Sequence, residues 1–233
     1  MSVLAIIPAA GVGVRMGSEL PKQFLSLEGA PIFIHTLRKF SASSAIDTIH
    51  LGVRPEDRVQ VGANLASERF SKPVRIVAGG ASRQQTVQNA LAEAPPETDI
   101  VVVHDAVRPF VSLDLIGQVV EAARRGGAAI LGIPSVDTVK QVERQTILGT
   151  LPRERIVLAQ TPQAFRCSLL REAFARAEAD DYQATDESGL LERLGIPVAV
   201  LMGSDRNIKI TKPSDLPLAR LYLAQEREQQ PVS

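Results

Sequence analysis

The residues best suited to chemistry stand in a glycine-rich turn, PAAGVGVRMGSELPKQF, which follows a short apolar run near the start of the chain. Its small residues let backbone N–H groups approach an anion closely: Ala9, Ala10, Gly11 and Gly13. Two cations, Arg15 and Lys22, follow in the same stretch, seven residues apart. Together these features indicate recognition of a triphosphate, and the alternative is a pair of solvated loop charges.

Two common phosphate-binding loops fail on spacing. A dinucleotide-binding turn requires G-x-G-x-x-G, but Met16 stands at the third glycine position and the glycine comes one residue later, at Gly17. A Walker A loop requires G-x-x-x-x-G-K-[ST], and the chain contains no Gly-Lys-Ser or Gly-Lys-Thr string. The spacing therefore argues against an NAD-dependent oxidoreductase and against a P-loop enzyme.

The turn must be positioned by the elements around it, and apolar strand-like runs alternate with helical segments along most of the chain. Strands are predicted over 3–7, 46–53, 74–78, 99–105, 128–134, 198–202 and 207–211. Helices are predicted over 31–40, 56–70, 82–94, 112–125 and from about 213 to 228. Continuous apolar strands separated by helices indicate an α/β fold, a Rossmann-like, mostly parallel sheet with helices on both faces.

One stretch, 137–165, interrupts this alternation with short alternating segments and no helical stripe. It predicts a protruding β-hairpin arm over about 136–160. An isolated two-stranded arm is at best marginally stable, so we expect it to dock on a second copy of the chain. The alternative is a long loop folded on its own domain. Residues 1–233 are predicted to form a single domain that carries this arm.

Composition excludes several classes of function. Lys and Arg together number 26, as do Asp and Glu, so no global charge points to nucleic acid or a membrane surface. No stretch approaches the roughly 18 apolar residues of a membrane span. The single cysteine, Cys167, excludes an intrachain disulfide and is typical of a reducing compartment. We therefore expect a cytoplasmic protein with small-molecule partners and no nucleic acid or membrane partner.

The remaining polar motifs fall at the ends of predicted strands. GGASRQQT follows the third strand, HDAVRP the fourth and PSVDT the fifth, while NIKIT lies in the late strand region. Open parallel sheets bind ligands at the carboxyl ends of their strands. This clustering predicts one functional site at that edge of the sheet.

In order, these motifs resemble those of the 2-C-methyl-D-erythritol 4-phosphate cytidylyltransferases. The segments that carry the resemblance run from about Val3 to Tyr222: PAAGVGVRMGSELPKQF, GGASRQQTV, VHDAVRPF, DTVK, TPQAF, ATDESGLLE and NIKIT. The resemblance implies a nucleotide-diphospho-sugar transferase type of fold, a homodimer, and transfer of CMP from CTP to methylerythritol phosphate in non-mevalonate isoprenoid synthesis, the MEP pathway. It also implies Mg²⁺ or another divalent cation, held mainly by the CTP phosphates, with Asp105 as a candidate ligand.

The resemblance gives each motif a role. The expected catalytic residues are Arg15, Lys22, Arg153 and Lys209. The expected nucleotide-binding residues are Pro8, Ala9, Ala10, Gly11, Gly13, Gly79, Gly80, Arg83, Thr86, Asp105 and Ala106. The expected acceptor-binding residues are Asp105, Arg108, Thr138, Arg153, Thr185 and Lys209. Of these, Arg153 and Thr185 are expected to serve the partner subunit's site.

Some of these assignments have alternatives. Arg155 stands two residues from Arg153, and a small alignment error would exchange them. The alternative for Thr185 is a helix N-cap, and for Asp105 and Arg108 it is a plain ion pair. Alternative functions are a ribitol 5-phosphate cytidylyltransferase and a catalytically inactive nucleotide sensor.

The acceptor chemistry suits a sequence with only three histidines. A phosphate monoester is largely dianionic at pH 7 and needs no general base, and we expect His35 and His50 to be structural. The sequence departs from the family pattern at three positions, Thr86, Val107 and Arg206. The arginine puts the local charge near the acceptor in question.

Overall fold

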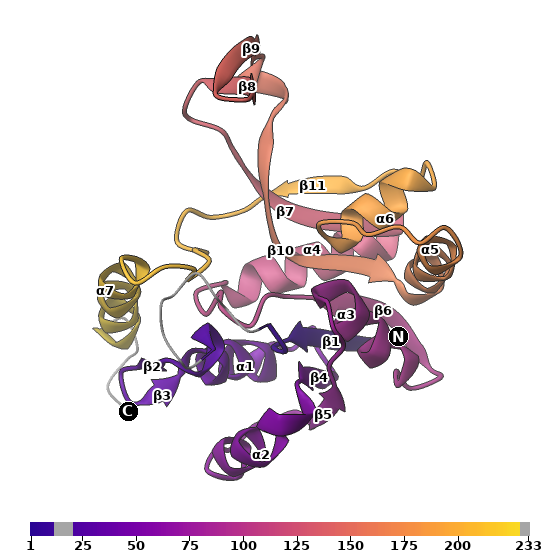
Figure 1. The fold of residues 1–233 in the computed structure, drawn as a ribbon. Helices are drawn as coiled ribbons and strands as arrows, with labels where there is room; N and C mark the ends of the chain where they lie inside the picture. Colours follow the sequence, from indigo (N-terminus) through magenta and orange to yellow (C-terminus); the bar gives the residue numbers. More distant parts are fainter. Residues whose placement is uncertain (12–20, 229–233) are drawn as a thin grey trace.

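The computed structural model describes residues 1–11 and 21–228. At its centre lies a seven-stranded sheet of order β11-β7-β10-β6-β1-β4-β5 (Figure 1). Its strands are β1 (Ser2–Pro8), β4 (Thr48–Val53), β5 (Val74–Ala78), β6 (Thr98–Val103), β7 (Ala128–Pro134), β10 (Val157–Arg166) and β11 (Ala199–Met202). Neighbouring strands run parallel except for β10, which is antiparallel to both β6 and β7. The predicted mostly parallel sheet is confirmed.

Helices cover both faces of this sheet, and β1 shows why. Its side chains alternate between two buried clusters, with Val3, Ala5 and Ile7 on one face and Leu4 and Ile6 on the other. The first cluster includes side chains of α1 (Ile32–Ala42), α2 (Arg58–Ala66) and α4 (Leu113–Gly126). The second includes side chains of α3 (Arg83–Ala92), α5 (Cys167–Ala179) and α6 (Glu187–Arg193). The sequence analysis does not predict α5 or α6.

The predicted strand over 207–211 is wrong. These residues form an extended segment outside the sheet, in which the Ile210 N–H donates to the Val107 carbonyl (3.0 Å). Ile210 is fully buried in a third cluster with Ala219 of the C-terminal helix α7 (Asp215–Glu228). Its alternating pattern reflects an extended chain with one buried side, and not pairing with another strand.

The arm is a two-stranded hairpin of β8 (Val139–Glu143) and β9 (Thr146–Leu151), which extends from the body of the molecule (Figure 1). Arg144 and Gln145 form its two-residue turn, with φ of 43° and 67°. The chain rejoins the central sheet at Val157, the first residue of β10, a few residues before the predicted end of the arm at about 160.

The remaining short elements lie between these strands and helices. They are η2 (Lys22–Phe24), β2 (Ser26–Leu27), β3 (Ala30–Pro31), η3 (Pro55–Asp57) and η4 (Arg153–Arg155). None of the described helices has the length and apolar character needed to cross a membrane.

Candidate active site

Four of the five polar segments predicted to form a site line one cleft of about 440 Å³, and the fifth, PSVDT, does not. It lies where β1 and β6 end and α3 begins, the edge of the sheet at which ligand binding is expected. The predicted site residues that line it are Pro8, Ala9, Ala10, Gly11, Lys22, Gly80, Arg83, Thr86, Asp105, Ala106 and Lys209. The sequence analysis assigns no binding role to the rest of the described lining: Gln23, Arg54, Ala81, Ser82 and Val107.

The turn after β1 is held by the side chain of Gln23, which belongs to η2. Gln23 is 2% exposed, and its Nε2 donates to the carbonyl oxygens of Ala9 (2.7 Å) and Gly11 (2.9 Å). The Ala9 N–H donates to the Gly52 carbonyl of β4 (2.7 Å). The backbone at residues 9–11, the described start of the turn, is therefore fixed from two sides, and Lys22 lines the same cleft.

A second turn, after β5, packs closely against the first. A Cβ added at Gly79 would lie 2.5 Å from the Cβ of Ala10, so only glycine fits there. The Thr86 hydroxyl accepts the N–H of Gly80 (3.0 Å) and donates to the Ser82 carbonyl (2.9 Å). Thr86 thus fixes the backbone of this turn against the start of α3.

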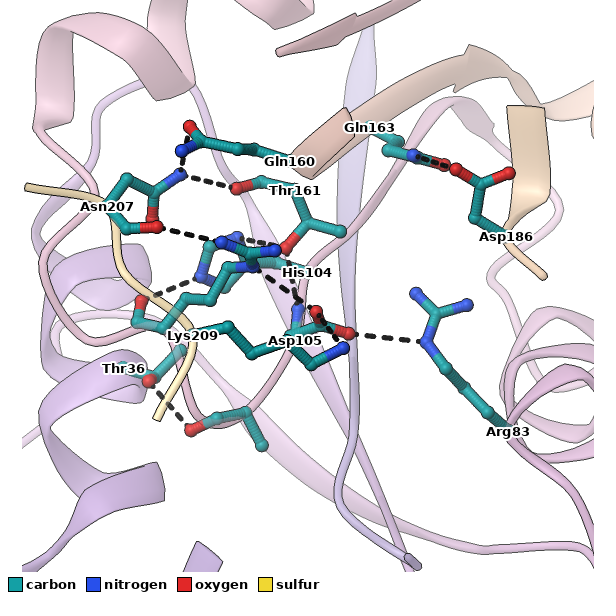
Figure 2. Close-up of polar contacts among 12 residues, drawn as sticks. Thr36, Arg83, His104, Asp105, Gln160, Thr161, Gln163, Asp186, Asn207 and Lys209 are labelled. Carbon is teal, nitrogen blue, oxygen red and sulfur yellow. Dashed lines mark hydrogen bonds and ion pairs between the residues drawn. The ribbon is translucent and has the colours of Figure 1, made fainter. Parts of the chain in front are cut away.

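Asp105 lies at the centre of a cluster of charges (Figure 2). Its Oδ2 lies 2.9 Å from Lys209 Nζ and 3.3 Å from Arg108 Nε, and its Oδ1 lies 3.3 Å from Arg83 Nε. Burial alone would raise the pKa of Asp105, but Arg83, Lys209 and Arg108 outweigh it and hold the pKa well below its usual range. The carboxylate therefore stays ionised and holds together three cations that would otherwise repel one another.

His104 supports the backbone of Asp105 and has a defined tautomer. The ring is 0% exposed, with Nε2 at 2.9 Å from the Arg108 carbonyl oxygen and Nδ1 at 3.1 Å from Thr161 Oγ1 (Figure 2). Because a carbonyl can only accept, the proton is on Nε2, and Nδ1 accepts the Thr161 hydroxyl. The Thr161 oxygen then accepts the Asp105 N–H (3.0 Å). Burial lowers the pKa of His104 to about 4, so the ring is neutral at pH 7.

Asn207 joins the Lys209 segment to this arrangement. Its Nδ2 donates to Gln160 Oε1 (3.1 Å) and to the Thr161 carbonyl (2.8 Å), and the side chain is fully buried. The backbone carbonyl of Asn207 accepts a hydrogen bond from Arg108 Nη1 (2.8 Å). With Asn207 fixed in this way, Lys209, two residues further on, lines the cleft.

Two residues that depart from the family pattern, Arg206 and Val107, lie differently with respect to the cleft. Arg206 points away from the cleft, with its guanidinium carbon 4.5 Å from the centre of the Tyr222 ring and Nη1 donating to Gln225 (2.8 Å). Its charge is therefore directed to α7. Val107 contributes to the lining of the cleft, and its side chain is packed in the third buried cluster with Ile210.

Arg83 has a second partner in Glu187, the first residue of α6. Arg83 Nη1 donates to both carboxylate oxygens of Glu187, at 2.7 and 2.9 Å. Burial raises the pKa of Glu187, and the Arg83 charge opposes that rise. Arg54, which also lines the cleft, pairs with Asp57 through two bonds of 2.7 and 2.9 Å. The sequence analysis gives no role to Arg54 or to Glu187, although Glu187 stands in the ATDESGLLE segment of the family resemblance.

Four predicted acceptor residues do not belong to the lining of this cleft: Arg108, Thr138, Arg153 and Thr185. Thr138 precedes β8 and is exposed, and Arg153 follows the arm, where its Nη1 donates to the Val136 carbonyl (2.9 Å). Thr185 is exposed in the turn before α6. Gly13 and Arg15 lie outside the described residues.

The alternative for Thr185, an N-cap, is wrong. Asp186 caps α6, because its Oδ1 accepts the N–H of Gly189 (3.1 Å). Gly79 and Arg108 each lie one layer behind the lining of the cleft, against Ala10 and Asp105 respectively.

The fit of the site to a divalent cation depends on the nucleotide. No group of three or more His, Cys, Asp or Glu suited to a metal ion occurs in the part of the chain that the structure describes. Asp105 is the one carboxylate in the described lining of the cleft. Mg²⁺ often binds through one or two carboxylates and substrate phosphates. Asp105 already pairs with three cations, so the residues fit a cation held mainly by the nucleotide phosphates, and not one held by protein ligands alone.

Comparison with known proteins identifies what the chain is similar to. Residues 3–225 match the family model described as IspD, 2-C-methyl-D-erythritol 4-phosphate cytidylyltransferase. Relatives carrying that enzyme name include one from Solibacter usitatus, 50% identical over all of both chains. Another, from Acidobacterium capsulatum, is 52% identical over 97% of this chain and 98% of its own.

Solved structures agree with these matches. The crystal structure of 2-C-methyl-D-erythritol 4-phosphate cytidylyltransferase from Thermus thermophilus has a TM-score of 0.78 and 37% identity, covering 97% of this chain and all of its own. The Francisella tularensis structure of the same name has a TM-score of 0.81 and 35% identity, covering 95% of this chain and 100% of its own.

Proposed function

The chain belongs to the 2-C-methyl-D-erythritol 4-phosphate cytidylyltransferase family, and we propose that it transfers CMP from CTP to 2-C-methyl-D-erythritol 4-phosphate. The products are 4-diphosphocytidyl-2-C-methyl-D-erythritol and pyrophosphate. An oxygen of the acceptor phosphate forms a bond to the α-phosphorus of CTP. The bond from that phosphorus to the oxygen of the β-phosphate breaks, and its electron pair leaves with pyrophosphate.

The observation that carries this proposal is the positive charge gathered at one cleft. Lys22, Arg83 and Lys209 line it, and Arg108 lies behind Asp105. Both substrates are anionic, so repulsion between them opposes the reaction, and fixed cations reduce it without reorganising. One well-placed group of this kind is typically worth about 10²–10³ in rate, or about 3–4 kcal/mol.

The reaction needs no general base, and the chain's three histidines are engaged elsewhere. His35 Nε2 lies 2.8 Å from the Leu27 carbonyl oxygen, and His50 Nδ1 lies 3.0 Å from that of Ala90. Both nitrogens of His104 are bonded inside the protein. The acceptor phosphate has a second pKa near 6, so it is already a nucleophilic dianion at pH 7.

In this proposal, each group of residues around the cleft has a separate role. The turn after β1, with Lys22 and Arg15, stabilises charge on the α-phosphate as its coordination rises to five. The turn at Gly80 holds the cytosine, whose size suits compact backbone. Lys209 orients the acceptor phosphate, and Asp105 holds Lys209 in place through their ion pair (2.9 Å).

A homodimer through the arm is part of the same proposal. The hairpin exposes four large apolar side chains, Val142, Ile147, Leu148 and Leu151. Clustered exposed apolar side chains are typical of interaction surfaces. In such a dimer Arg153 and Thr185 would complete the acceptor site of the partner subunit.

We also propose Mg²⁺ as the cofactor and the cytoplasm as the location. Bound to the triphosphate, a divalent cation would neutralise part of its charge, with Asp105 as the protein ligand. The location is proposed from the single cysteine, which is buried and free.

The test is release of pyrophosphate from CTP with a panel of polyol phosphates. We expect turnover with methylerythritol phosphate at a kcat/KM well above that with ribitol 5-phosphate, since none of the relatives reported above is named for ribitol. CTP binding without pyrophosphate release from any acceptor would instead support a nucleotide sensor.

A further inference from the structure

Glu187 is a buried acid for which the proposed reaction has no direct use. It is 1% exposed at the start of α6 and lies 104 residues from Arg83, which binds it through Nη1. The start of α6 is fixed in turn, because Asp186 accepts from Gln163 Nε2 (2.8 Å) and from the N–H of Gly189 (3.1 Å). Glu187 therefore presents a carboxylate from a rigid support.

Stability gives little reason for an ionised acid at this place. Removing a carboxylate from water costs several kcal/mol, and a buried ion pair often stabilises a protein no more than apolar side chains of the same volume. The ion pair with Arg83 offsets the free-energy cost of burying the Glu187 charge but adds no obvious net stabilisation of the fold. A role in arranging the site accounts better for its presence.

The geometry of Arg83 shows what is arranged. Its Nε donates to Asp105 (3.3 Å) and its Nη1 to Glu187, so two carboxylates fix the plane of the guanidinium. Within the described parts of the chain no partner is found for its Nη2. Arg83 lines the cleft, so Nη2 is the donor group left for an anionic ligand.

We propose that Glu187 is a positioning residue that holds Arg83 with its remaining N–H donors toward the bound nucleotide and keeps Asp105 in contact with Lys209. This inference rests on the proposed function, because it assumes that the nucleotide of the transfer reaction occupies the cleft. Glu187 acts only through Arg83. Without the second carboxylate, the guanidinium is free to rotate about its remaining contact with Asp105.

A double-mutant cycle tests this dependence. The variants are Glu187→Gln, which keeps the shape and removes the charge, Arg83→Gln, and the double variant. Misplacing a group by about 1 Å costs about 10²-fold, so we expect Glu187→Gln to lower kcat/KM for CTP about 10- to 100-fold. The KM for the acceptor should stay within about twofold. The double variant should be no worse than Arg83→Gln alone.

Controls separate positioning from stability. Glu68→Gln removes a carboxylate from an ion pair with Arg38 (2.7 Å) outside the cleft, and it should leave the kinetics unchanged. If Glu187→Gln does not fold, Glu187→Asp keeps the charge and withdraws the carboxylate by one methylene, and the same cycle applies.

The outcomes that overturn the inference are specific. Additive losses in the double variant would show that Glu187 acts independently of Arg83. Wild-type kinetics with a lowered Tm in Glu187→Gln would show a purely structural role. Failure of the unaltered protein to release pyrophosphate would instead refute the proposed function, so the two failures are distinguishable.

Discussion

Replacing Gln23 with methionine would test whether the turn after β1 must be held rigidly. Methionine has nearly the same length but no N–H donors, so the carbonyl oxygens of Ala9 and Gly11 would lose the bonds of 2.7 and 2.9 Å. Each neutral hydrogen bond contributes about 0.5–1.5 kcal/mol, which gives about 1–3 kcal/mol for the pair. If the turn is ordered by these bonds when the α-phosphate reacts, that energy is lost from the transition state.

A loss of this size corresponds to about a 5- to 150-fold fall in kcat/KM, since about 1.36 kcal/mol is tenfold in rate. Gln23→Glu should be worse, because a carboxylate would face the carbonyl oxygens of Ala9 and Gly11. The assay is CTP-dependent pyrophosphate release at saturating acceptor, with Tm measured in parallel.

The matched control is Gln118→Met, which removes an exposed amide bond to Asp114 (2.7 Å) on α4 and should leave turnover unchanged. A Gln23→Met variant with kcat/KM within twofold of the unaltered protein, whatever its Tm, would refute the reasoning.

Three further predictions concern charge, protonation and assembly. Asp105→Asn should lower kcat/KM at least 10²-fold, because loss of one electrostatic group in an active site typically costs about 10²–10³ in rate. Its Tm should rise with added salt more than that of the unaltered protein, because three cations then lack their carboxylate; equal salt dependence would contradict this. The pKa of His104 is about 4 in the folded protein and 6.5 in the unfolded chain. As the pH falls from 6.5 to 4, only the unfolded chain binds a proton at this residue, so the free energy of unfolding falls by about 3 kcal/mol. His104→Gln should lack this loss in urea unfolding at pH 7 and 4.5, and identical pH slopes would count against it. Mixing Lys22→Ala with Arg153→Ala should restore about a quarter of normal activity, because half the random dimers would carry one intact site; no recovery would place Arg153 in its own subunit's site.

The alternation of strands and helices can be predicted because the central strands β1, β4 and β6 are buried on both faces, which makes their residues almost continuously apolar. The position of the site could also be predicted, since β1 and β6 end at the same edge of the sheet and ligands bind at the carboxyl ends of such strands. The helix α5 was missed although its signal is present: Leu170, Ala173, Phe174 and Ala177 are buried at helical spacing.

Other features have no local signal. Ile208 and Ile210 alternate with Asn207 and Lys209 as in a strand, yet they pack beside α7 and pair with no neighbouring strand. The contact of Glu187 with Arg83 depends on where two helices, α6 and α3, begin in space. Only tertiary structure brings such residues together, so spacing along the chain could not predict them.

The strand β10 links the hairpin to the chemistry. It begins at Val157, where the chain returns from the arm, and four residues later its Thr161 accepts the Asp105 N–H. At about 3.3 Å per residue, only about 13 Å of strand separates the foot of the arm from Thr161. We therefore expect a tether or antibody that holds the hairpin to alter turnover through β10.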